Sequence, residues 1–203
     1  MALTAFFRDM QTLHYIVAHV FPEVVGRSRI KIWDAGCASG EEPFTLAMIC
    51  REHLGEFAFR NVVIHATDHE ESDFPQFREM ISQGVYPDLV LKTTPRPDLM
   101  RKFSRRVRLG YVQVDEEIRA RVRYERHDLL SFREVASDFC LVVCKNVLLH
   151  FQPAERIEVV RMFHRALVPG GYLAFDQAQR VPPETEGLFD NIAEGGFLYR
   201  KRA

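Results

Sequence analysis

Apolar and polar positions recur along this chain in two periods, which predict β-strands and α-helices in turn. The clearest strand is the run 138–147, whose apolar and β-branched residues are typical of a strand covered on both faces in a parallel sheet. Apolar residues at helical spacing indicate a helix over 154–166. Further strands are predicted at 29–36, 61–68, 106–114, 121–129, 170–177 and 195–202, and further helices at 42–53, 74–83 and 98–103.

A first helix is predicted within residues 1–21, before any of the strands. Thr4 is its candidate N-cap, and Pro22 follows its expected end. Strands that alternate with helices favour an α/β fold with a doubly wound sheet, in which ligands bind outside the carboxyl ends of the strands. No long linker, internal repeat or low-complexity tract interrupts the pattern, so we expect one domain over residues 1–203.

The turn after the first predicted strand belongs to the stretch "WDAGCASGEEPFTLAM", residues 33–48. A nicotinamide-binding turn requires GxGxxG, and a nucleoside triphosphate loop requires GxxxxGK[ST]. The spacing of Gly36 and Gly40 matches neither of these motifs. The turn also lacks a lysine or arginine that would bind phosphate. We therefore exclude the two common nucleotide loops.

Acidic residues surround this turn and suggest a different ligand. Asp34 precedes the turn, and Glu41 and Glu42 follow it at a helix N-terminus, where they would repel a pyrophosphate but suit a cationic amine or sulfonium. Asp68 ends the next strand, where dinucleotide folds place the acid that binds ribose hydroxyls. S-adenosylmethionine carries a cationic amine, a sulfonium and ribose hydroxyls. In the alternative interpretation, the glutamates only favour the helix dipole and Asp68 only caps the following helix.

Composition narrows the classes of partner and compartment. The formal net charge of −1 excludes a broadly basic nucleic-acid-binding surface, although the arginine-rich stretch 96–126 allows an anionic partner locally. No apolar run approaches the roughly 20 residues that span a bilayer, and no signal-peptide pattern opens the chain. We expect a cytoplasmic protein without membrane insertion. We expect free, buried thiols, because no CxxC spacing occurs among Cys37, Cys50, Cys140 and Cys144, and we expect no metal site.

Five stretches, in order, resemble the CheR family of chemotaxis-receptor glutamate methyltransferases: "TAFFRD", "WDAGCASGEEPFTLAM", "ATD", "CKNVLLHF" and "LVPGGYL". The resemblance implies a class I S-adenosylmethionine-dependent methyltransferase fold, with a Rossmann-like seven-stranded mixed sheet and helices on both faces. It also implies a small antiparallel β insertion at about residues 104–120. The separate N-terminal helical domain of that family has no counterpart in this sequence.

The resemblance also implies site residues. Thr4 and Arg8 match the family's T-x-F-F-R stretch, which reaches the cofactor and the methyl-transfer region. Asp128 and Leu129 match a pair that flanks the adenine, and Asn146 and Val147 match the C-R-N-V motif. With the acidic turn, the expected binding residues for S-adenosylmethionine and its product S-adenosylhomocysteine are Thr4, Arg8, Asp34, Gly36, Gly40, Glu41, Glu42, Asp68, Asp128, Leu129, Asn146 and Val147. The segment 1–21 is expected to fold over the cofactor as a lid.

Three departures from the family pattern concern the acceptor side of the site. Lys145 replaces the usual arginine and cannot form its bidentate fork. His150 replaces a tyrosine close to the reacting centre. The run "AFDQAQR" stands where many members carry glycine, histidine, serine and glutamate.

Arg8 and His150 are the candidate catalytic residues, and they favour different acceptors. Methyl transfer is an in-line displacement, so the enzyme mainly aligns the reacting groups in a dry pocket. A carboxylate acceptor is already ionised and needs only a cation such as Arg8 to place it. A protonated amine needs a base, for which His150 is suited.

Three functions therefore remain open from the sequence. The first is a methyltransferase that acts on glutamate in a chemoreceptor-like protein. The second is a methyltransferase that acts on a small molecule or on another protein side chain. The third is a non-catalytic signalling module that binds S-adenosylmethionine or S-adenosylhomocysteine.

Overall fold

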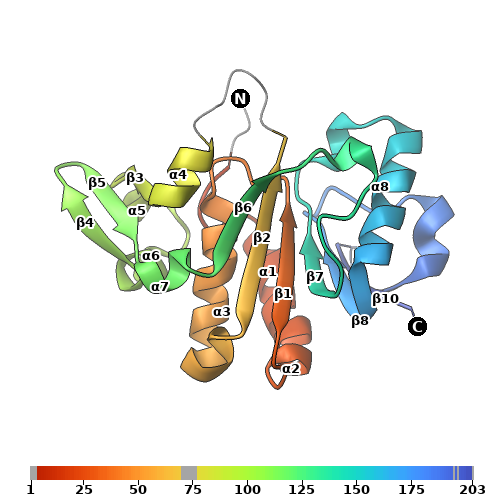
Figure 1. Cartoon of the computed structure of the whole chain (residues 1–203), viewed down its shortest axis with the longest axis horizontal. Coiled ribbons are helices and arrows are strands. Elements are labelled where there is room, and N and C mark those ends of the chain that lie inside the picture. Colours follow the sequence, from red (N-terminus) through yellow and green to blue (C-terminus); the bar gives the residue numbers. More distant parts are fainter. Residues whose placement is uncertain (1–3, 70–76, 194, 196, 203) are drawn as a thin grey trace.

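A seven-stranded mixed sheet forms the centre of this computed structural model, which describes residues 4–69, 77–193, 195 and 197–202 (Figure 1). The strand order is β6-β2-β1-β7-β8-β10-β9. The strands are β1 (Ile30–Ala35), β2 (Val62–Asp68), β6 (Val122–Arg126), β7 (Phe139–Val143), β8 (Leu167–Ala174), β9 (Phe189–Asn191) and β10 (Leu198–Lys201). The first five strands in the order are mutually parallel, and β10 pairs antiparallel with both β8 and β9. This arrangement confirms the expected fold class.

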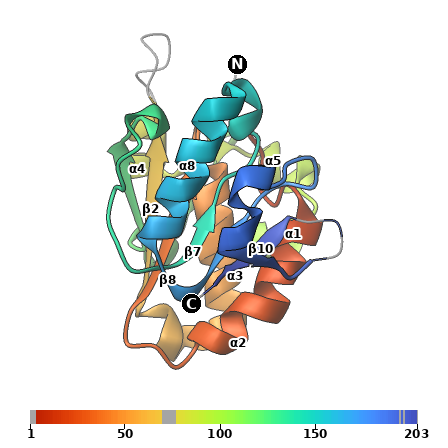
Figure 2. The same ribbon diagram turned by 90° about the vertical axis from the view of Figure 1, so that its right-hand side faces the viewer.

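Helices cover both faces of the sheet (Figure 2). The face of Ile32 packs against α3 (Glu41–Phe59) and the N-terminal helices, whereas the face of Trp33 packs against α8 (Pro153–Ala166). Successive side chains of a strand point to opposite faces, which explains why β7 is buried along its whole length. The regular part of α3 ends near Gly55, whose φ of 75° interrupts the helix.

A second, three-stranded antiparallel sheet lies beside the main sheet (Figure 1). Its order is β3-β5-β4, with β3 at Val85–Pro87, β4 at Ser104–Arg108 and β5 at Tyr111–Val114. The strand expected at 106–114 is therefore a hairpin that turns at Gly110, where φ is +76°. The short strand β3 lies before the expected bounds of the insertion. Short helices accompany this sheet: α4 (Phe77–Gln83), α5 (Val90–Thr93), α6 (Pro97–Lys102) and α7 (Glu116–Arg119).

The N-terminal segment differs from the expected continuous helix. Its first helix, α1, spans Met10–Tyr15, so Thr4 is not the N-cap, and the chain continues through a π-helical turn at Ile16–Val20 into α2 (Phe21–Val24). Phe7 has a φ of 58°, which a right-handed helix cannot accommodate, and its backbone N–H donates to Oγ1 of Thr45 at 2.9 Å. Phe6 and Phe7 are buried in the core, and the first helical turns expected at these residues do not form.

Pro22 is also placed differently from the expectation, because it lies in the first turn of α2 rather than after the helix. Proline carries no N–H group, and in the first turn of α2 this loss removes no hydrogen bond within that helix. The predicted helix at 74–83 is seen as α4 from residue 77, and its first three residues fall outside the described part of the chain. Among the described residues, no helix is both long and apolar enough to cross a membrane.

Candidate active site

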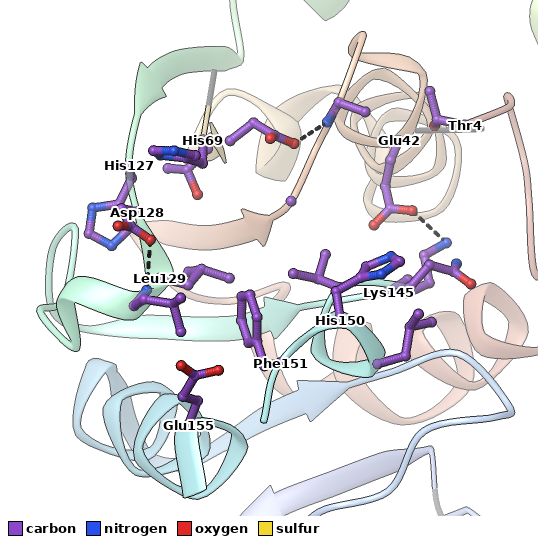
Figure 3. A pocket seen from close by; sticks show the side chains of 18 of the residues that line it. Thr4, Glu42, His69, His127, Asp128, Leu129, Lys145, His150, Phe151 and Glu155 are labelled. Carbon is purple, nitrogen blue, oxygen red and sulfur yellow. Dashed lines mark hydrogen bonds and ion pairs between the residues drawn. The ribbon is translucent and has the colours of Figure 1, made fainter. Parts of the chain in front are cut away.

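A cavity of about 830 Å³ opens at the carboxyl ends of the neighbouring parallel strands β6, β2, β1 and β7. Figure 3 shows side chains from the chain segments after these strands facing the same space. The expected site residues that line it are Thr4, Arg8, Gly36, Glu42, Asp68, Asp128, Leu129, Asn146, Val147 and His150. Expected residues from positions 4 to 150 of the sequence therefore meet in one place.

The turn after β1 is held against the end of β2. The backbone N–H of Ala38 donates to Oδ2 of Asp68 at 2.7 Å, and the N–H of Gly36 donates to the carbonyl of Thr67 at 2.8 Å. Gly36 has a φ of +102°, and a Cβ there would lie 2.2 Å from Cγ2 of Val147. Glycine is thus required both by the backbone conformation and by the close approach of the β7 segment.

Three expected site residues do not line the cavity: Asp34, Gly40 and Glu41. Asp34 is fully buried within β1. Gly40 faces α4 and β3, because a Cβ there would meet Cγ1 of Ile81 at 2.5 Å and the hydroxyl of Tyr86 at 2.9 Å. Glu41 accepts a hydrogen bond from Oγ of Ser39 at 2.6 Å. Since successive helical residues point about 100° apart, only one of the two adjacent glutamates lines the cavity, and it is Glu42.

A buried ion pair between Glu42 and Lys145 borders the cavity (Figure 3). Nζ of Lys145 lies 2.8 Å from Oε2 of Glu42, and the Lys145 side chain is 2% exposed. The same amino group donates to the backbone carbonyl of Arg8 at 3.2 Å. Burial alone would lower the pKa of Lys145, but the neighbouring carboxylates, chiefly Glu42, outweigh it and raise that pKa. Lys145 is therefore charged.

Asp34 lies beside this pair without lining the cavity. Both of its carboxylate oxygens are buried, and its carboxyl group lies within hydrogen-bonding reach of the Glu42 side chain. Burial, followed by the negative charge of Glu42, raises the pKa of Asp34 well above its ordinary value. The carboxyl group thus retains its proton to higher pH than an exposed aspartate does.

Arg8 reaches the cavity from the N-terminal segment. Its Nη2 donates to Oδ1 of Asn146 at 3.1 Å, and its Nε lies 3.8 Å from Oδ2 of Asp9. Asn146 follows β7 with a φ of +57°, and its backbone N–H donates to Oδ2 of Asp176 at 2.9 Å. A chain of hydrogen bonds therefore connects the end of β8 through Asn146 to Arg8.

Asp176 was not among the expected site residues, although it is 4% exposed and fixes Asn146. Asp176 could have been found from the sequence, because it is an acid at the end of an apolar strand, as Asp68 is. The cavity is also lined by residues that were not predicted: Ala38, Thr67, His69, His127, Leu130, Lys145, Leu149, Phe151 and Glu155.

His150 is exposed and ends a short 3-10 helix, Leu148–His150, at the rim of the cavity. Its side chain lies toward the end of the cavity that holds Glu42 and Lys145, whereas His127 and Asp128 lie at the other end (Figure 3). The cavity thus has one end where charged residues and the candidate catalytic groups gather, and a second end bounded by the β6 segment.

The side chains that line the cavity suit S-adenosylmethionine as a ligand. Carboxylates of Glu42, Asp68 and Asp128 border the cavity, and Leu129 and Val147 add apolar surface. Carboxylates suit a positively charged amine and sulfonium and can accept hydrogen bonds from ribose hydroxyls, whereas apolar side chains suit a planar base. The Gly36 turn lies directly against Val147, so its backbone borders the cavity without a side chain.

The fold and this cavity define a class I S-adenosylmethionine-dependent methyltransferase. The family described as "CheR methyltransferase, SAM binding domain" matches residues 2–195. The chain therefore belongs to the CheR methyltransferase family.

Named relatives agree with this family. "Chemotaxis protein methyltransferase 1" of Pseudomonas aeruginosa is 30% identical over 206 residues, covering 98% of this chain and 73% of the relative. "Probable chemotaxis protein methyltransferase" of Rhizobium etli is 26% identical over 203 residues, covering 97% of this chain and 74% of the relative. The solved structure of PKMT2 from Rickettsia typhi has a TM-score of 0.50 at 12% identity, covers 85% of this chain and 26% of that one, and is similar in fold.

Proposed function

We propose that this enzyme transfers a methyl group from S-adenosylmethionine to a glutamate carboxylate of a chemoreceptor-like protein. The observation that carries the proposal is the placement of Arg8, whose guanidinium group lines the cavity and is oriented by Asn146. A guanidinium group suits a carboxylate geometrically and would repel a protonated amine. The names of the relatives, chemotaxis protein methyltransferases, support the same acceptor.

The cofactor residues are part of this proposal. When bound, S-adenosylmethionine supplies an electrophilic methyl group on a sulfonium. Asp68 would accept hydrogen bonds from the ribose hydroxyls, and Glu42 would face the cationic methionine portion. Asp128 and Leu129 would border the adenine, and the Gly36 turn would allow close approach of the backbone. Thr4 and Arg8 would close the site from the N-terminal segment.

The segment 1–21 would form a fixed wall of the site rather than a loose terminus. Support comes from Phe6 and Phe7, which are 2% and 0% exposed, and from the hydrogen bond between Phe7 and Thr45. These anchors directly precede Arg8, so they would hold its guanidinium group over the acceptor. Alignment of this kind is the main contribution that an enzyme makes to an in-line displacement.

A second candidate function is methylation of an amine or another group that must lose a proton. The observation that favours it is His150, which lines the same cavity as Arg8 and is exposed at its rim. In that case His150 would accept the proton from the acceptor. We place the reaction in the cytoplasm, and the four free, buried cysteines agree with a reducing compartment.

A methyl-transfer assay with labelled S-adenosylmethionine and an extract of the source cells tests the proposal. Labelled protein that releases methanol in mild alkali would indicate an ester, because methylated amines resist such treatment. The expected result is an alkali-labile product that forms with wild type and is nearly absent with Arg8→Ala. An alkali-stable product would instead favour the second candidate.

A further inference from the structure

A second cavity of about 420 Å³ adjoins the methyl-transfer cavity. Its walls are the N-terminal turns of α8 on one side and the segment 178–184, which follows β8, on the other. Leu149 lines both cavities and is 48% exposed. A ligand that fills the first cavity can therefore continue over Leu149 into this second one, which we call the flanking groove.

The flanking groove is positively charged. Its charged lining residues are Arg156, Arg180 and Glu184, which leaves one net positive charge. Arg156 donates to the carbonyls of Leu149 and Phe151, and Arg180 donates to backbone carbonyls nearby. Neither arginine forms an ion pair with a carboxylate in the part of the chain that the structure describes. Their charges are thus fixed in place and not neutralised.

The groove also contains a buried acceptor that lacks a donor. Gln179 lines the groove, is 7% exposed, and donates through Nε2 to Oδ2 of Asp176. Its Oε1 is buried and has no hydrogen-bond partner among the described residues. A buried oxygen without a donor is unfavourable, so a ligand with an N–H group would be favoured there. A polypeptide backbone supplies one N–H group at nearly every residue.

We infer that the flanking groove binds the stretch of acceptor polypeptide next to the methylated glutamate and prefers an acidic side chain in that stretch. This inference rests on the proposed function. The apolar lining, which includes Ile157 and Val181, suits side chains of a polypeptide, the arginines suit a carboxylate, and Gln179 suits a backbone N–H. A free small acceptor would occupy only the first cavity and would leave this groove unused.

Steady-state methylation of two synthetic peptides tests the inference. Both carry one central glutamate, flanked by aspartates in the first peptide and by asparagines in the second. Wild type should show a lower KM for the aspartate peptide. Arg180→Glu should raise the KM for that peptide about tenfold, corresponding to about 1.4 kcal/mol, and should largely remove the preference between the two peptides. Its affinity for S-adenosylhomocysteine, measured by calorimetry, should match that of wild type.

Arg161→Glu is the matched control, because Arg161 is exposed on the same helix α8 but does not line the groove. It should leave the KM for both peptides unchanged. If wild type esterifies the glutamate but Arg180→Glu and Arg161→Glu have equal KM values, the groove inference is wrong and the proposed function stands. If wild type esterifies neither peptide and no protein in the extract assay, the proposed function fails and the groove inference fails with it.

Discussion

Lys145 and Glu42 form an ion pair of 2.8 Å at the border of the cavity, although they come from segments about a hundred residues apart. The amino group of Lys145 also donates to the carbonyl of Arg8. The buried amino group of Lys145 thus connects α3, which begins after the Gly36 turn, with the N-terminal segment that carries Arg8. Any change in this pair is expected to affect both the stability of the fold and the position of Arg8.

Glu42→Gln is expected to destabilise the protein strongly. The substitution leaves the charge of Lys145 buried with its closest carboxylate removed, and breaking a buried pair in this way costs about 3–5 kcal/mol. Asp9, at 3.7 Å from Nζ, will offset part of the loss, so we expect about 2–3 kcal/mol in urea unfolding. Glu41→Gln is the control and should cost clearly less, because Glu41 bonds to Ser39 rather than to a cation. Equal losses for the two variants would contradict the role of the pair.

Asp68→Ala is expected to weaken binding of S-adenosylhomocysteine. It removes the proposed ribose contacts, each a charge-assisted hydrogen bond of at most about 1.5–3 kcal/mol, and also the bond that holds Ala38. Asp68→Asn keeps one oxygen and should lose less affinity. Calorimetry of both variants beside wild type measures the effect, and an unchanged affinity in Asp68→Ala would refute the assignment.

Phe7→Ala is expected to lower stability and turnover together. Truncating a fully buried phenylalanine costs about 3–5 kcal/mol, and the loss falls directly beside Arg8. Leu109→Ala, at a side chain that is 98% exposed, is the control and should change neither property. Deleting residues 1–9 should likewise remove turnover and weaken cofactor binding. A deletion variant with normal turnover would show that the segment is not part of the site.

His150→Tyr is expected to retain appreciable activity, because a carboxylate acceptor needs no base. The pH–rate profiles of wild type and variant should then have the same shape on the acidic side. If His150 acts as a base, the wild-type profile should have an acidic limb that disappears in the variant. The variant should then lose about 10²–10⁴-fold in rate at unchanged cofactor affinity. That second pattern would favour the amine acceptor.

Asp34→Asn is expected to change how stability depends on pH. The pKa of Asp34 is raised in the folded protein by burial and then by Glu42, so the unfolded chain releases this proton at lower pH than the folded protein does. Between the two pKa values the unfolded state binds fewer protons, and the free energy of unfolding falls as the pH rises. The stability of wild type relative to Asp34→Asn should therefore increase as the pH is lowered from neutrality. Urea unfolding of both proteins over a pH series measures this difference, which should stay constant if Asp34 titrates normally.

Much of the parallel core could be predicted, because its signals are local. Strands β1, β2 and β7 have apolar, β-branched sequences, and each leads into a turn marked by glycine or a polar side chain. The N-terminal segment could not be predicted in this way. Its sequence has helical periodicity, but burial of Phe6 and Phe7 against residues distant in the chain overrides the local preference.

Local sequence signals predicted the candidate site where an acid ends a strand, as at Asp68, which lines the cavity. Arg8 and Asn146 also line it, but they were expected only because their stretches resemble the CheR family. Glu41 and Glu42 could not be separated by sequence, because the direction of a helical side chain depends on where the helix begins. The pairing of Lys145 required the meeting of three distant segments, which no pattern along the chain encodes.

The hydrogen bond from Oγ1 of Thr12 to the carbonyl of Phe175, at 3.0 Å, has a consequence for biosynthesis. Tyr15 likewise packs edge-on against Phe197, with 5.0 Å between ring centroids. During translation the N-terminal segment leaves the ribosome first, yet its docking partners are made almost last. Thr12 and Tyr15 therefore reach these partners only after the final strands have emerged. The growing chain would acquire a complete catalytic wall only near the end of its synthesis, and its earliest residues would be the ones most in need of protection from aggregation.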